Sequence, residues 1–101
     1  MAISKRNATN AEAAESLAIQ ALAFLAAEPE RLGRFLAVTG IGPGEIRSAA
    51  REPHFLAGVL EYLANDEPLL IEFANQTGVD PTEVARAFAK LGHEPPNRDF
   101  P

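Results

Sequence analysis

The sequence predicts an all-α protein, a single compact bundle of about six short helices. Apolar residues recur at the three- and four-residue spacing of amphipathic helices, whereas no segment alternates with the two-residue period of a strand. Prolines and glycines stand where such helices would begin and end. With 101 residues, of which 47% are hydrophobic, the chain suits one domain with one core.

The first helix is expected to run from about Thr9 to Ala27. Thr9 and Glu12 have the spacing of a capping box, in which each side chain bonds the backbone amide of the other residue. Residues 1–8 precede this helix and residues 93–101 are rich in proline, so both are expected to be flexible tails. The predicted domain therefore spans residues 9–92. The apolar stripe of its first helix consists of Ala14, Leu17, Ala18, Ala21, Leu22 and Leu25.

Five further helices are predicted, most of them with a proline in the first turn, where the missing amide proton costs nothing. Gly40, Gly78 and Gly92 stand at helix ends, because glycine adopts the left-handed capping conformation readily. Asp80 and Glu83 are expected to form a second capping box. The expected ranges of these helices are 29–39, 43–50, 53–65, 67–77 and 81–91.

The chain also contains an internal repeat. The segments around Gly40 and Gly78, 38 residues apart, both read Phe-x-x-x-Thr-Gly-[Ile/Val]-x-Pro-x-Glu-[Ile/Val]. Upstream, Phe24-Leu25-Ala26 matches Tyr62-Leu63-Ala64 at the same separation. Convergent helix punctuation is the alternative explanation, since sharp helix corners favour these residues. The match predicts two pseudo-symmetric three-helix units, about residues 22–50 and 60–88, that pack together.

Few residues have the arrangement of a catalytic or metal site. The chain has no cysteine, and its two histidines, His54 and His93, lack a second ligand at metal-binding spacing. The glycines of residues 40–44 resemble a phosphate loop, but no strand precedes them and no Lys-Ser or Lys-Thr follows. We therefore expect no catalytic residue, no bound metal and no cofactor, and interpret the protein as non-enzymatic.

Residues 70–91 resemble the helix-turn-helix of bacterial transcription regulators, with a turn at Gly78. The charge argues against DNA, because the net charge is −5 and both Asp80 and Glu83 lie at the leading end of the reading helix. Specific nucleic-acid binding is thus the alternative hypothesis. Its contacts would come from Arg47, Arg51, Arg86 and Lys90.

The leading hypothesis is a protein-interaction or adaptor domain that binds an unknown protein or a second copy of itself. The first helix carries apolar residues opposite its main stripe, and such a helix lies either at the centre of a core or at a contact surface. Nearby arginines would steer an acidic partner towards it. The candidate contacts are Ile19, Ala23, Ala26, Ile71, Arg31 and Arg34.

Neither a signal peptide nor a membrane span is expected. The apolar run from Leu17 to Ala27 is too short to cross a bilayer, is interrupted by Gln20, and follows Glu12 and Glu15. We therefore expect a cytoplasmic protein.

Three stretches carry a resemblance to a known family: residues 21–26, residues 34–40, and residues 55–60 with the acidic Asp66-Glu67 after them. Together they make the chain resemble a family of uncharacterised alphaproteobacterial proteins of about this length, a domain of unknown function. The resemblance implies a small bacterial cytoplasmic helical protein. It implies no activity that transfers to particular residues.

Overall fold

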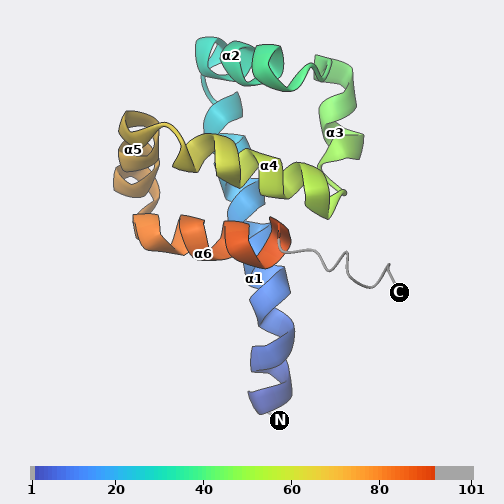
Figure 1. Ribbon diagram of the computed structural model, residues 1–101, viewed down its shortest axis with the longest axis vertical. Helices are drawn as coiled ribbons and strands as arrows, with labels where there is room; N and C mark the ends of the chain where they lie inside the picture. The colour runs from blue at the N-terminus through green and yellow to red at the C-terminus, as the bar shows by residue number, and fades with distance from the viewer. Residues whose placement is uncertain (1, 93–101) are drawn as a thin grey trace, which may run out of the picture.

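The computed structural model describes residues 2–92, and the side chains of residues 11–92. Every regular element in this part of the chain is a helix, which confirms the all-α class. The longest helix is α1, and α4 and α6 lie side by side across it (Figure 1). The elements are α1 (Ala2–Ala26), α2 (Pro29–Thr39), the 3₁₀ helix η1 (Pro43–Glu45), α3 (Ile46–Ala49), α4 (Pro53–Ala64), α5 (Glu67–Thr77) and α6 (Pro81–Gly92).

Prolines fix where α2 and α4 begin. Pro29 and Pro53 are the first residues of these helices, as predicted. The residue before a proline is disfavoured in the helical region by the pyrrolidine ring. Accordingly Glu28 has φ −125° and ψ 124°, and Glu52 has φ −94° and ψ 122°. The chain therefore turns sharply before each helix.

The beginning of α1 differs from the prediction. The helix starts at Ala2, seven residues before Thr9, so the predicted capping pattern does not mark a helix end. No proline or glycine lies between Ala2 and Ala26. Threonine and asparagine cost less than about 0.7 kcal/mol each in a helix, which is too little to stop one. Residues 2–8, expected to be a flexible tail, thus belong to α1, and residues 93–101 lie outside the described residues.

The second predicted capping box forms only in part. Asp80 accepts hydrogen bonds from the backbone amide of Thr82 at 3.0 Å and from its hydroxyl at 2.9 Å. The bond from the amide lowers the pKa of Asp80. The amide of Glu83 donates instead to the backbone carbonyl of Asp80, at 2.8 Å. The Asp80 carboxylate therefore caps the beginning of α6 without help from Glu83.

The two repeated corners have the same local structure. Gly40 and Gly78 have φ of 77° and 81°, in the left-handed region that glycine tolerates. In the second corner the hydroxyl of Thr77 donates to the carbonyl of Phe73 at 2.7 Å and accepts from the amide of Val79 at 3.1 Å. The first corner repeats both bonds through its own threonine. The sequence match at the corners thus reflects a shared hydrogen-bond pattern.

The third helices of the two predicted repeat units differ from each other. α6 has 12 residues and packs against α4 and α1, whereas its counterpart is divided into the short η1 and α3. Overall symmetry between residues 22–50 and 60–88 therefore stays a prediction. What recurs is the corner.

We expect Gly78→Val to destabilise the domain by about 1–2 kcal/mol, because a β-branched residue resists left-handed backbone. A side chain there would meet no atom within 4 Å, so the effect isolates backbone strain. Gly33→Ala in α2 is the control, since Gly33 also has free space but no positive φ, and it should stabilise by about 0.5–1 kcal/mol. Urea unfolding measures both changes. A Gly78→Val variant as stable as the parent protein would contradict the prediction.

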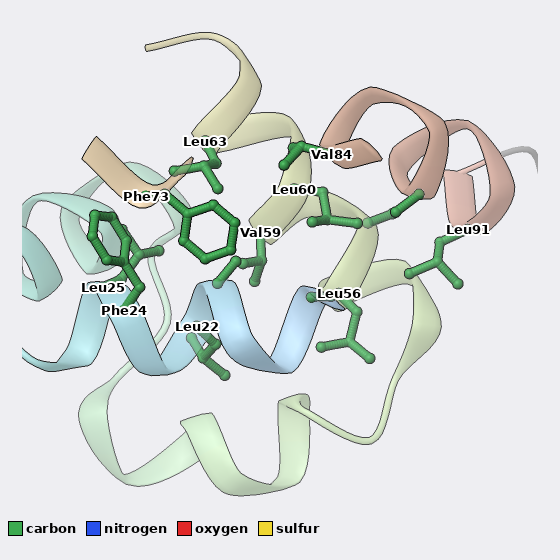
Figure 2. Packing of buried hydrophobic residues seen from close by; sticks show 14 of the residues in the cluster. Leu22, Phe24, Leu25, Leu56, Val59, Leu60, Leu63, Phe73, Val84 and Leu91 are labelled. Atoms are coloured by element: carbon green, nitrogen blue, oxygen red, sulfur yellow. The ribbon is translucent and has the colours of Figure 1, made fainter. Parts of the chain in front are cut away.

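The core lies between α1, α4 and α6 (Figure 2), and aromatic pairs extend it towards α5 and α2. The ring of Phe73 meets that of Phe24 edge to face, with 5.3 Å between centroids. Phe35 stands edge to face with both Phe55 and Tyr62, at 5.9 and 5.1 Å. Since such pairs add about 0.5–1.5 kcal/mol beyond burial, they attach α5 and α2 firmly to the bundle.

Candidate functional site

α1 has both a buried and an exposed apolar side. Ala18, Ala21 and Leu25 are fully buried against the rest of the bundle. On the other side Ile19 is 44% exposed, and Ala23 and Ala26 are exposed as well. Because the positions 19, 23 and 26 are separated by four and three residues, they form one stripe along the helix. We call these three residues the Ile19 face.

Two further large apolar side chains lie exposed away from the Ile19 face. Ile71 on α5, one of the predicted contacts, is 46% exposed. Val38 on α2 is 70% exposed and was not among the predicted contacts. The sequence could have indicated this exposure, because Val38 lies off the apolar stripe formed by Leu32, Phe35 and Leu36. Single exposed apolar residues are common on protein surfaces, so neither defines a site alone.

Arg31, one of the predicted partner contacts, is engaged within the chain. Its side chain is only 11% exposed. Nη1 donates to the carbonyl oxygen of Phe24 at 2.9 Å, and the guanidinium carbon lies 4.1 Å from the centroid of the Phe24 ring. Nη2 lies 3.0 Å from Glu72 and 3.8 Å from Glu28. Arg31 thereby joins the end of α1 to α2 and α5. Arg34, in contrast, is exposed.

The four residues of the nucleic-acid hypothesis fall into two separate pairs. Arg47 lies in α3 and Arg51 two residues after the end of α3, whereas Arg86 and Lys90 lie one turn apart on α6. All four side chains are exposed, and the salt bridges found among residues 11–92 involve none of them. α3 lies away from α6 in the bundle, so the two pairs belong to different parts of the structure (Figure 1).

An open groove between α1 and α6 has a volume of about 910 Å³. Its apolar lining comes from small side chains and from Leu17 and Val79. Polar and charged side chains complete it. Sequence reasoning missed this groove, because nothing local in the sequence shows that α6 lies across α1. The lining residues are Ala13, Ala14, Ser16, Leu17, Gln20, Val79, Glu83, Arg86, Ala87, Ala89 and Lys90.

The groove adjoins the Ile19 face. Successive residues of a helix are rotated by about 100°, so Ser16 and Gln20 lie on α1 between Ile19 and the groove side. Both are exposed and line the groove. The Ile19 face and the groove therefore form a continuous surface along the second half of α1, the longest helix of the bundle.

The described residues offer little for metal chemistry. His54 is exposed, and no group of three or more histidine, aspartate or glutamate side chains within residues 11–92 is arranged to hold a metal ion. Asp66, in an acidic stretch before α5, accepts a hydrogen bond from the amide of Leu69 at 3.2 Å and so caps that helix. No helix of residues 2–92 has the length and apolar character needed to cross a membrane.

Comparison with known proteins gives one match. No curated protein and no solved structure matches the chain. A family model described as "Protein of unknown function (DUF3572)" matches residues 11–94, which include the whole α1–α6 groove and the Ile19 face. The chain belongs to this family of proteins of unknown function.

Proposed function

We propose that the protein is a non-enzymatic interaction domain that binds a protein partner through the Ile19 face. The exposure of Ile19 carries this proposal, because the opposite side of the same helix already supplies the core. Full burial of an isoleucine side chain contributes about 1.5–3 kcal/mol. A partner that covers Ile19 would bury the part of its side chain that stays exposed in the folded domain, and so gains part of this energy.

The surroundings of Ile19 suit a helical partner. Ala23 and Ala26 are short, so a second helix can approach the backbone of α1 closely. On α2, Arg34 is exposed, whereas Arg31 is held within the chain. The nucleic-acid hypothesis has no comparable support, since Asp80 and Glu83 precede the basic pair of α6.

The test is Ile19→Asp, which should leave the fold intact and remove partner binding. Because Ile19 is 44% exposed, aspartate there loses only part of the roughly 1.5–3 kcal/mol that full burial of isoleucine contributes, whereas a charge buried in an apolar contact is strongly unfavourable. The matched control is Val38→Asp, which places the same charge at an exposed apolar position elsewhere.

The tagged parent protein and the Ile19→Asp and Val38→Asp variants are each purified from cells that express the protein, and the proteins bound to them are identified. Sedimentation gives the mass of each, which shows self-association. Circular dichroism verifies the fold of each variant. We expect Ile19→Asp, but not Val38→Asp, to lose either one bound protein or its association with a second copy of itself. An identical set of bound proteins for all three would contradict the proposal.

A further inference from the structure

We infer that the α1–α6 groove holds an amphipathic helix of the protein partner, oriented by charged side chains along α6. This inference rests on the proposed function and names the chemistry that the surface recognises. Three features carry it: the apolar lining, the small side chains, and the order of charges on α6.

The lining of the groove fits a helix. Four of its lining residues are alanines, two on α1 and two on α6, and Leu17 adds a larger apolar side chain. Helices pack at axial separations of about 8–10 Å, and the short side chains of alanine allow the lower end of this range. The groove follows α6 over residues 83–90, which at about 1.5 Å per residue corresponds to some two turns of a helix docked alongside α6.

The charges on α6 specify the polarity of this helix. Along the groove the order is Glu83, Arg86, Lys90, one negative charge followed by two positive ones. These side chains make no salt bridge with the described residues, although the charge of Arg86 also acts on Asp80 and helps to lower its pKa. The complementary helix carries a basic residue at one end of its apolar stripe and two acidic residues towards the other.

The groove also differs in sign from the protein as a whole. The chain has a net charge of −5, whereas the groove carries one more positive than negative charge. At physiological ionic strength the screening length is about 8 Å, so a ligand in the groove responds to the nearest charges more than to the distant ones. An acidic helix is therefore favoured there despite the acidic protein.

The probes are two designed helical peptides with the same leucine stripe. The first carries lysine beside the Glu83 position and glutamates beside the Arg86 and Lys90 positions, and the second has all these charges reversed. We expect the first to bind the full chain at least about tenfold more tightly, a difference of about 1.4 kcal/mol. Amide chemical shifts should change within residues 13–20 and 79–90.

The double variant Arg86→Glu and Lys90→Glu should reverse the preference between the two peptides. Arg47→Glu with Arg51→Glu is the matched control, because it changes the net charge equally at a different place, and its preference should equal that of the parent protein. Equal binding of both peptides, no binding at about 1 mM peptide, or shift changes elsewhere would overturn the inference. Tighter binding of duplex DNA than of the first peptide to the same residues would overturn it as well.

The outcomes separate this inference from the proposed function. If partner binding is lost in Ile19→Asp but unaffected by Arg86→Glu with Lys90→Glu, the partner uses the Ile19 face and the groove inference fails. If the α6 variant alone loses the partner, the groove is the binding site and the proposed role of the Ile19 face fails. Loss in both variants supports a partner that covers the continuous surface.

Discussion

Ala18→Asp is expected to unfold the domain, although the neighbouring Ile19→Asp is expected to leave it folded. Ala18 is fully buried, and no polar or charged side chain among residues 11–92 is buried with it. A carboxylate there has no hydrogen-bond partner, and its protonated form still loses the hydrogen bonds that water provides. The additional atoms must also be accommodated in a close-packed site, which typically costs about 1–3 kcal/mol. Together these effects reach the 5–15 kcal/mol that stabilise a typical domain.

Circular dichroism and thermal unfolding of Ala18→Asp test this expectation, with Ile19→Asp as the control for the helix propensity of aspartate. The control should retain the helical spectrum and cooperative unfolding of the parent protein. Ala18→Asp should show little helix at 25 °C or unfold without cooperativity. A folded Ala18→Asp variant would mean that the buried side of α1 has been assigned incorrectly, and that α1 is not a core helix.

The sequence predicted most helix ends to within a residue, because proline and glycine act locally. Pro29 begins a helix through the geometry of its own ring, and Gly78 ends one through its own φ. The beginning of α1 could not be located this way. Thr9 occupies a potential cap, but whether a helix starts there depends on whether the preceding residues form helix too.

The candidate site was predicted unevenly, for a similar reason. Helix periodicity placed Ile19 off the main apolar stripe, but it left open whether this side of the helix lies in the core or at the surface, and the structure shows Ile19 to be 44% exposed. Periodicity also could not predict the role of Arg31, because its partner Glu72 lies 41 residues further along the chain and is brought near by the packing of α5. The groove likewise depends on α6 crossing α1. Such non-local contacts leave no periodic signal in a single sequence.

Phe73→Ala is expected to destabilise the domain by about 3–5 kcal/mol, the range typical of buried aromatic truncations. Phe73 is fully buried, and it is the one residue of α5 that is (Figure 2). The substitution removes the edge-to-face contact with the ring of Phe24. It also leaves a cavity in the core that only rearrangement of α5 can fill. Because the same Phe24 ring supports the guanidinium of Arg31, the attachment of α2 should weaken too.

Urea unfolding followed by circular dichroism measures the effect, and Phe55→Ala provides the comparison. Phe55 also makes an edge-to-face contact, with Phe35, but it is only partly buried. Its truncation leaves a site that water can enter, so the loss should be clearly smaller than for Phe73→Ala. Hydrogen exchange should show that the amides of α5 lose protection first in Phe73→Ala. Equal destabilisation by the two substitutions would show that α5 contributes no more to the core than the beginning of α4 does.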